Sequence, residues 1–345
     1  MGKVTVKDVA AAAEVSASSV SNYFNQPARL SEATRERIRA AVAELEFVPN
    51  DAARRLRAGI NPVIGYVAFE LTSAFTPAIA NTIEREVAQR GLHLLMANDN
   101  ESPARELSYI DLFEMQRVSG LIVAPFGDVE TELLDLKRRG TPSVLSGRLA
   151  TSPYLASSSA DSVLGGYLAV KHLLEIGRRR VAFVTTSPEL RQMSDRLQGA
   201  LKAIEEHGGA TFEVIQVPER SVRAGIRVAM SIAERTASTR PDAVFCANDL
   251  LGIGVIQHLA ASSDIRIPAD IAVIGYDDNE FAASTAVPLS SVRVSAESLG
   301  VAAVELLFEE MDLVAGARPG ELPEVPSRHL LFEPELVPRA SSVGA

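Results

Sequence analysis

The chain has 345 residues, enough for two or three domains with sizeable cores, and 47% of them are hydrophobic, as is ordinary for a globular protein. Its net charge of −10 argues against DNA binding by the molecule as a whole, and its single cysteine excludes an internal disulfide and a CxxC zinc or redox site. With no charged-then-apolar leader and no apolar run long enough to cross a bilayer, we expect a cytoplasmic protein with no membrane partner.

The charge is divided unevenly along the chain. Residues 1–60 carry nine Lys or Arg and seven Asp or Glu, a charge of +2, and the remaining 25 basic and 37 acidic residues give −12. This division suits a protein that contacts DNA only through its N-terminal part. Because that part is only weakly basic, two joined copies would bind far better than one, and we expect a homodimer.

Residues 4–24, with the sequence VTVKDVAAAAEVSASSVSNYF, predict two short helices joined by a tight turn at residues 14–16. Thr5 and Asp8 have the spacing of a capping box, and Ser16 is placed to cap the second helix. One apolar face of the first helix is formed by residues three and four apart: Val6, Val9, Ala10 and Ala13. The layout is that of a DNA-reading helix-turn-helix, although these residues alone fit a simple packed hairpin equally well.

The next segment strengthens the DNA-binding interpretation. A third helix is predicted from Ser31, with Ile38, Val42 and Leu45 as its buried stripe. Residues 47–59, FVPNDAARRLRAG, then predict a basic helix with one exposed apolar side chain, Leu56. Basic residues around a lone leucine suit a helix in the minor groove whose leucine opens a base step, and the alternative is that Leu56 anchors this segment to the rest of the chain.

From Pro62 onward, apolar runs alternate with amphipathic segments of about a dozen residues. The runs are PVIGYVAF, HLLMAN, GLIVAP, PSVLS, RVAFVTT, FEVIQVP, AVFCAN and IAVIGYDD. The helical segments are 77–90, 104–117, 129–139, 162–176, 191–207, 221–235, 249–261 and 295–313. Continuous apolar strands alternating with helices predict an α/β core of parallel sheets covered on both faces.

Polar residues follow several of these strands. They include residues 69–76, Asn98, Asp99, Ser146, Arg148, Asn248, Asp249, Asp277 and Asp278. Ligands of such folds bind outside the carboxyl ends of the strands, and Asp, Asn and Arg beside an aromatic ring suit a polyhydroxylated ligand. Each residue alone is better explained as a helix cap, which we expect for Asp249, and Asp278 can be structural.

Together these motifs resemble the lac repressor (LacI/GalR) family of bacterial transcription regulators. The resemblance rests on VTVKDVA, VSASSVS, RLSEATRERI, EFVPNDAARRLR, CANDL and IPADIAVIGYDD, which span most of residues 3–339 in the family's order. It implies an all-α helix-turn-helix headpiece at residues 1–49 and a hinge helix at 50–60. It also implies a periplasmic-binding-protein-like core of two doubly wound parallel-sheet subdomains, at 61–160 with 289–321 and at 161–288 with 322–339, and a flexible tail at 340–345.

By this resemblance the chain is a repressor that binds a palindromic operator in double-stranded DNA. We expect phosphate contacts from Thr5, Ser16, Ser21, Asn25, Ser31 and Thr34, and hinge contacts from Asn50, Ala53, Arg54, Leu56 and Arg57. We expect Ala17, Ser18 and Asn22 to read bases. Family members commonly have arginine at position 22, so asparagine predicts adenine in place of guanine. They commonly have glycine where this chain has Glu14, so its turn must accommodate a side chain.

The resemblance also implies a small-molecule effector, a sugar or sugar derivative, bound by Phe75, Thr76, Arg148, Met193, Arg196, Asn248 and Asp277. Effector binding would change the angle between the subdomains and thereby the spacing of two hinges in a dimer. The sequence leaves open whether the effector weakens or strengthens DNA binding, but the coupling must be reciprocal.

Two other classes of function were weighed. Against an enzyme, the five histidines are scattered, and HExxH, GxSxG and P-loop motifs are absent from the sequence. Gly252 and Gly254 form only half of a dinucleotide fingerprint and fall inside a helix, and Cys246 lies in an apolar strand. We therefore predict no enzyme, no cofactor and no metal. The remaining alternative, a transporter's sugar-binding protein, would need an export leader in place of residues 1–60.

Overall fold

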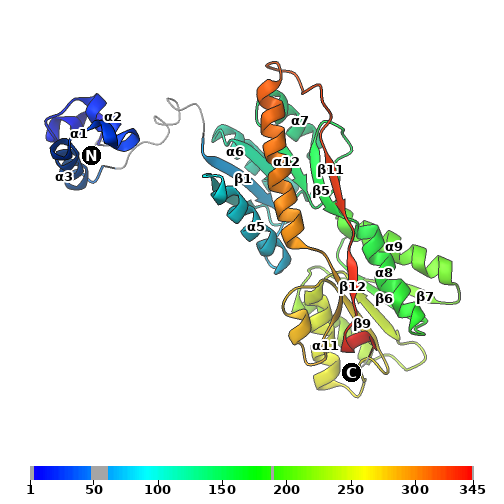
Figure 1. The fold of residues 1–345 in the computed structure, drawn as a ribbon. Coiled ribbons are helices and arrows are strands. Elements are labelled where there is room, and N and C mark those ends of the chain that lie inside the picture. The colour runs from blue at the N-terminus through cyan, green and yellow to red at the C-terminus, as the bar shows by residue number, and fades with distance from the viewer. Residues whose placement is uncertain (1–3, 48–60, 188–189, 344–345) are drawn as a thin grey trace. The chain divides into compact units, whose positions relative to one another are not determined.

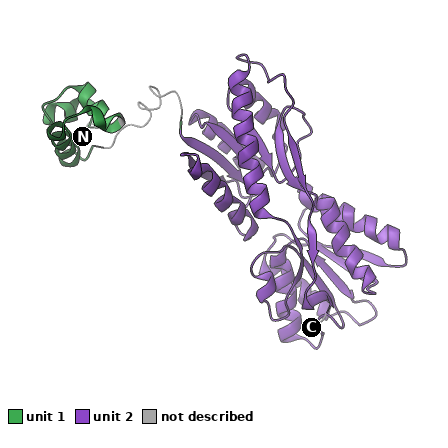
Figure 2. Ribbon diagram, in the orientation of Figure 1, with its two compact units in different colours: residues 1–61 green, residues 62–345 purple. Residues whose placement is uncertain are grey.

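The computed structural model describes residues 4–47, 61–187 and 190–343. The chain forms two compact units, residues 1–61 and residues 62–345 (Figure 2). The predicted hinge helix, with its five expected DNA contacts, lies outside the described residues. Within the described ranges, no helix is long and apolar enough to cross a membrane.

The N-terminal unit contains the three predicted helices: α1 (Val6–Ala12), α2 (Ala17–Asn25) and α3 (Glu32–Glu44), with a short 3-10 turn η1 (Pro27–Arg29) before α3. The predicted caps are confirmed. The backbone N–H of Thr5 donates to Asp8 Oδ2 at 2.8 Å, and the hydroxyls of Ser16 and Ser31 accept bonds from backbone N–H groups in the first turns of α2 and α3. These caps satisfy N–H groups that a helix start otherwise leaves unpaired.

A small apolar core holds the three helices together. Val9, Val20 and Ile38, one from each helix, are fully buried. The predicted apolar face of α1 is only partly correct, because Val6 is 39% exposed. The turn between α1 and α2 does accommodate a side chain, since Glu14 takes the left-handed conformation, with φ of 51°.

The C-terminal unit contains two six-stranded sheets, one in each of two lobes (Figure 1). The first sheet consists of β1 (Val63–Ala68), β2 (His93–Asn98), β3 (Gly120–Val123), β4 (Ser143–Ser146), β5 (Ala156–Ala160) and β11 (His329–Phe332). The second consists of β6 (Arg180–Thr185), β7 (Thr211–Gln216), β8 (Ala243–Cys246), β9 (Ala272–Asp277), β10 (Ser290–Arg293) and β12 (Glu335–Val337). All eight strands predicted from apolar runs are present.

Helices cover both faces of each sheet, as predicted. The first sheet packs against α5 (Phe75–Gln89), α6 (Pro103–Met115), α7 (Glu130–Arg138) and α12 (Ala296–Gly316). The second lobe contains α8 (Ser162–Glu175), α9 (Arg191–His207), α10 (Val222–Ala233), α11 (Asp249–Ser262), η2 (Ala282–Ser284) and α13 (Ala340–Val343). Cys246 is a buried residue of β8.

The strand order places a ligand-binding crevice in each sheet. The orders are β11-β5-β4-β3-β1-β2 and β12-β10-β9-β8-β6-β7, and every pair is parallel except β10 with β12. The chain winds outward in opposite directions from β1 and from β6, so the loops after these strands diverge. Such switch points are where doubly wound sheets bind ligands.

The chain crosses between the lobes at positions that differ from those we expected. We expected residues 289–321 in the first lobe and 322–339 in the second. Instead β10 pairs with β9 in the second sheet, and β11 pairs with β5 in the first. The first lobe therefore comprises about residues 62–160 and 294–332, and the second lobe comprises about residues 161–293 and 335–343. The apolar pattern of a strand does not say which of two sheets the strand joins.

The prediction of a flexible tail is also wrong for residues 340–343. Residues 340–343 form α13, and Ser341 and Ser342 are buried against the second sheet. The Ser341 hydroxyl accepts a bond from Ser290 N at 2.7 Å and donates to the Val273 carbonyl at 2.6 Å. The Ser342 hydroxyl bonds to the side chains of His172 and Ser290. Short polar side chains can be buried here because each hydroxyl finds a hydrogen-bond partner.

Candidate ligand pocket and DNA-reading helix

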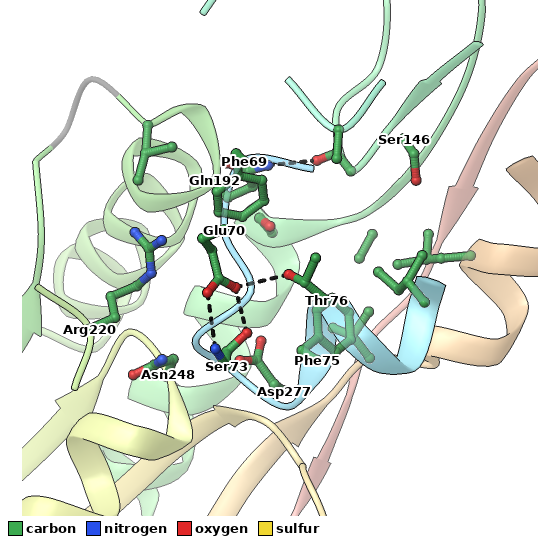
Figure 3. A pocket seen from close by; sticks show the side chains of 18 of the residues that line it. Phe69, Glu70, Ser73, Phe75, Thr76, Ser146, Gln192, Arg220, Asn248 and Asp277 are labelled. Carbon is green, nitrogen blue, oxygen red and sulfur yellow. Dashed lines mark hydrogen bonds between the residues drawn. The ribbon is translucent and has the colours of Figure 1, made fainter. Parts of the chain in front are cut away.

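A pocket lies between the two lobes of the C-terminal unit, where loops from both switch points meet (Figure 3). It encloses about 780 Å³ of empty space, including its open mouth. Six of the seven predicted effector contacts line it: Phe75, Thr76, Met193, Arg196, Asn248 and Asp277.

Arg148 is the exception. It follows β4 as expected, but it lines a neighbouring cleft with Asp128 and Glu130. Its guanidinium donates to the Gly127 carbonyl at 3.2 Å and to Asp128 at 3.0 Å. These contacts hold its side chain away from the pocket, so Arg148 is not placed as an effector contact.

Close packing of α8 against α9 fixes the position of Arg196. Gly199, three residues after Arg196, lies so close to α8 that an added Cβ would be 1.8 Å from the Val163 carbonyl oxygen. In the same contact, a Cβ on Gly166 would be 2.0 Å from the Arg196 carbonyl oxygen. Only glycine fits at these two positions, and this explains the Arg-x-x-Gly spacing in physical terms.

The Arg196 guanidinium is held by groups beneath the pocket. It lies 3.5 Å from the centre of the Tyr276 ring, a stacked cation–π contact, and its Nη1 donates to the Ala247 carbonyl. Its Nη2 is 3.8 Å from Asp277 Oδ1, too far for a direct hydrogen bond. A guanidinium and a carboxylate at this separation leave donor and acceptor positions for the hydroxyls of a ligand.

Asp277 has two properties typical of a functional residue. Its φ of 97° lies in the region that favours glycine, and only the surrounding structure can hold an aspartate there. Burial raises its pKa to about 7, an effect that Arg196 opposes and Glu70 reinforces. Near neutral pH the carboxyl is therefore divided between its acid and its carboxylate form.

Helix α11 is capped by Asn248, whereas we expected Asp249 to be its cap. The side-chain oxygen of Asn248 accepts from the backbone N–H of Leu251 at 3.1 Å, which directs the amide nitrogen elsewhere. Asp249 is fully buried and accepts from the Ser291 hydroxyl at 2.6 Å and from Asn279 N at 2.8 Å. Burial and the nearby Asp277 raise the pKa of Asp249. Asp278 is bound by Arg293 and Arg339, which confirms its structural role.

Glu70 was not among the predicted contacts, although it directly follows the first strand in the loop that carries Phe75 and Thr76. Its carboxylate accepts bonds from the hydroxyls of Ser73 and Thr76 (Figure 3) and from that of Thr72. Burial disfavours the carboxylate, but the hydrogen bonds from Ser73, Thr72 and Thr76 outweigh burial and lower its pKa. Glu70 thus organises this loop while occupying the loop's hydroxyls.

Two further missed residues join the lobes across the pocket. Arg220, which follows β7, forms an ion pair with Glu101 of the first lobe and donates to Thr186 at 3.1 Å. Gln192, on α9, donates from its amide to the Gly147 carbonyl of the first lobe at 3.1 Å. Both residues line the pocket, so they connect ligand binding with the relative position of the lobes. The rule that polar residues follow strands would have identified Arg220.

The predicted DNA contacts are distributed over the N-terminal unit. Ala17 and Ser18, in the first turn of α2, are exposed, and Ser21 and Asn22 on the same helix are half-buried. The predicted phosphate contacts Thr5, Ser16 and Ser31 are exposed helix caps, and Thr34 is half-buried. Asn25 is the last residue of α2. Surface is therefore available where a helix-turn-helix would present it.

Within the part of the chain that the structure describes, there is no group of three or more His, Cys, Asp or Glu side chains placed to hold a metal ion.

Known proteins share both units. Residues 5–50 match the lacI family of bacterial regulatory proteins, and residues 170–342 match the periplasmic binding protein-like domain. The transcriptional repressor PurR of Aliivibrio fischeri strain MJ11 is 31% identical over 313 residues, 89% of this chain and 91% of that protein. The ribose operon repressor of Bacillus subtilis strain 168 is 31% identical over 315 residues, 88% of this chain and 90% of that protein.

Solved structures agree with these sequence matches. A lac repressor dimer bound to operator and the anti-inducer ONPF has a TM-score of 0.77 and 26% identity, over 99% of both chains. The regulator CelR in complex with cellobiose has a TM-score of 0.69 and 26% identity, over 99% of this chain and 100% of that one.

A helix-turn-helix unit followed by a two-lobed binding-protein-like core defines a DNA-binding transcriptional regulator controlled by a small effector. The chain belongs to the lacI family of bacterial regulatory proteins.

Proposed function

We propose that the effector is a neutral, polyhydroxylated molecule of the size of a sugar, bound in the pocket between the lobes. The observation that carries this proposal is the pairing of Arg196 and Asp277 at 3.8 Å, with Asn248 beside them. Arginine donates and aspartate accepts, so neighbouring hydroxyls can bond to both at once. Phe75 supplies an aromatic ring against the apolar face of a sugar.

The charges around the pocket favour a neutral ligand over an anionic one. Arg220 is already paired with Glu101, and Arg196 lies beside Asp277. Glu70 adds a further negative charge, which its hydrogen bonds keep ionised. A phosphate or carboxylate group would therefore have to displace an existing partner.

The names of the relatives leave two ligand classes to compare: one regulates a ribose operon and CelR binds cellobiose, whereas others are called PurR. The test is a thermal-shift screen of the full-length protein with pentoses, hexoses, disaccharides and purine bases, because a ligand of the native state raises its melting temperature. We expect a sugar to stabilise the wild type and to have little effect on Arg196→Ala. Stabilisation by purines alone would contradict the proposal.

We propose further that α2 reads the operator through Ala17, Ser18 and Asn22, and that Thr5, Ser16, Ser21, Asn25, Ser31 and Thr34 contact phosphates. In the predicted hinge, the interface is completed by Asn50, Ala53, Arg54, Leu56 and Arg57. Selection of binding sites from random DNA tests this, and two-fold symmetric sites are the expected result. A selected pool without symmetry would contradict it.

A homodimer is part of the same proposal. β2 is the end strand of the first sheet, and its Leu95 and Met96 are about half exposed, at 50% and 45%. A second copy would cover this apolar surface. We infer that the molecule acts by binding, not by catalysis, and that it works in the cytoplasm, where its operator would be.

A further inference from the structure

The two walls of the pocket differ in chemistry. The second lobe contributes the groups that can bond to a ligand: Arg196, Asp277 and Asn248. The first lobe contributes mainly apolar surface: Phe69, Phe75, Ile79, Ala124, Val294 and Leu299. The hydroxyls of Ser73 and Thr76 on this side already donate to Glu70. Glu70 and Ser146 add polar side chains to this wall. A ligand that fills the pocket therefore meets hydrogen-bonding groups along one edge and mainly carbon along the other.

Tyr66 interrupts the apolar wall. It lies on β1, lines the pocket, and is fully buried, with the helices α5 and α12 packed over its face of the sheet. Among the described residues, its hydroxyl has no hydrogen-bond partner. A buried hydroxyl without a partner costs free energy, and sites where proteins retain one call for a physical explanation.

Ionisation of Tyr66 does not provide that explanation. Burial raises its pKa, and the neighbouring Glu70 raises it further, so the phenol stays protonated at any physiological pH. It therefore remains a neutral hydroxyl that can donate a hydrogen bond, on a residue that lines the pocket. A polar atom of the ligand would satisfy it.

We propose that Tyr66 is a specificity-determining residue, which donates a hydrogen bond to an oxygen on the mainly apolar edge of the ligand. The inference rests on the proposed sugar effector and specifies its class. The preferred ligand has adjacent hydroxyls on the edge that faces Arg196 and Asp277. Its opposite edge is mainly carbon and carries one acceptor oxygen, as in a deoxysugar or a methyl glycoside.

Paired sugars test the ligand class. The full-length protein is titrated calorimetrically with L-fucose and L-galactose, with L-rhamnose and L-mannose, and with D-glucose, D-galactose and their methyl β-glycosides. We expect the strongest ligand to be a deoxysugar or a methyl glycoside, bound at least about fivefold more tightly than its fully hydroxylated counterpart, because the apolar wall would leave an extra hydroxyl unpaired. Equal or tighter binding of the counterpart overturns the proposed class.

Two variants that each lack one hydroxyl test the role of Tyr66 in ligand binding. Tyr66→Phe should weaken the strongest ligand about tenfold, the effect of losing one hydrogen bond. Ser158→Ala is the matched control, because Ser158 is in the same sheet, is fully buried and does not line the pocket, and its hydroxyl has no partner among the residues that the structure describes. It should leave the affinity unchanged. Unchanged affinity in Tyr66→Phe, or equal losses in both variants, overturns the role of Tyr66.

Stability without ligand gives an independent check. Tyr66→Phe removes an unpartnered group, so the ligand-free variant should melt at the wild-type temperature or above it. A lower melting temperature would mean that the hydroxyl bonds to the protein itself and would overturn the inference. If no sugar binds the wild type at all, the proposed effector class fails together with the inference, and this result is distinct from binding that ignores Tyr66.

Discussion

Asp277 combines a backbone conformation that favours glycine with a pKa of about 7. If ligand hydroxyls bond to its carboxylate, the ligand must compete with a proton below pH 7. Effector affinity should therefore rise as the pH increases from 5.5 to 8, with a slope of up to about tenfold per unit on the acid side of the pKa. Calorimetric titrations across this range measure it.

Two variants separate Asp277 from other groups that titrate in the same range. Asp277→Asn should bind more weakly and with little dependence on pH. Burial and Glu106 also raise the pKa of Asp99 to about 7, but Asp99 does not line the pocket. Asp99→Asn should therefore retain the wild-type profile. An affinity that increases toward acid in the wild type would contradict the role of Asp277.

Asn22 sets the expected base preference of α2. An asparagine amide can form two hydrogen bonds with adenine, whereas an arginine at this position would bond to guanine. Asn22→Arg should shift the preference at one base pair of each half-site toward guanine by about 1–3 kcal/mol. Sites selected separately with the two proteins provide the measurement. Identical selected sequences would show that Asn22 does not read a base.

At the level of residues, the sequence alone predicted most of the pocket lining but not the residues that join the two lobes across it. Six of the contacts that the family resemblance implied line the pocket, and Asn248 and Asp277 among them also fit the rule that residues at the ends of parallel strands share one edge of the sheet. Arg148 has the same placement in the chain, but local ion pairs hold it elsewhere. Tyr66 was missed because an aromatic residue inside an apolar strand reads as ordinary core.

Helix α13 shows how hydrogen bonds can hold a short helix against a sheet. Ser341 bonds to two backbone groups of neighbouring strands, and its replacement leaves both without a partner. Ser341→Ala should destabilise the C-terminal unit by about 1–3 kcal/mol. Chemical denaturation measures this loss, and Val343→Ala, on the exposed side of the same helix, is the control with little expected effect. Equal stability of Ser341→Ala and wild type would mean that α13 is not docked.

The hinge predicted at residues 50–60 can be tested without its structure. If Leu56 enters the minor groove, Leu56→Ala should weaken operator binding and leave the affinity for sugar unchanged. Fluorescence anisotropy with labelled DNA and calorimetry with sugar measure the two affinities in the same preparation. Loss of both would indicate that Leu56 instead anchors the hinge to the core.

Elements were predictable where burial imposes a regular pattern. Eight strands followed from their apolar runs, but β5, with the sequence ASSSA, was missed because its buried serines do not resemble a core strand. The destinations of β10 and β11 were also missed. Which sheet a strand joins depends on contacts far away in sequence, and a local pattern does not contain that information.

On the scale of the whole molecule, the pocket lies where a bound ligand can affect the contacts between the two lobes. Gln192 and Arg220 contact both the ligand space and the opposite lobe, so a ligand that moves either one changes the contact between lobes. We propose that this change shifts the hinge spacing in a dimer and thereby the affinity for the operator. The shift requires only that the ligand bind two arrangements of the lobes with different affinity.

The most direct test of this coupling is operator affinity measured with and without the sugar that most stabilises the protein, in wild type and in Arg196→Ala. The operator is a site selected by the wild-type protein. We predict that the sugar changes wild-type affinity by about 5- to 150-fold, in either direction, and that Arg196→Ala binds the same DNA equally well but does not respond. A sugar that binds the wild type and leaves its operator affinity unchanged would contradict the account.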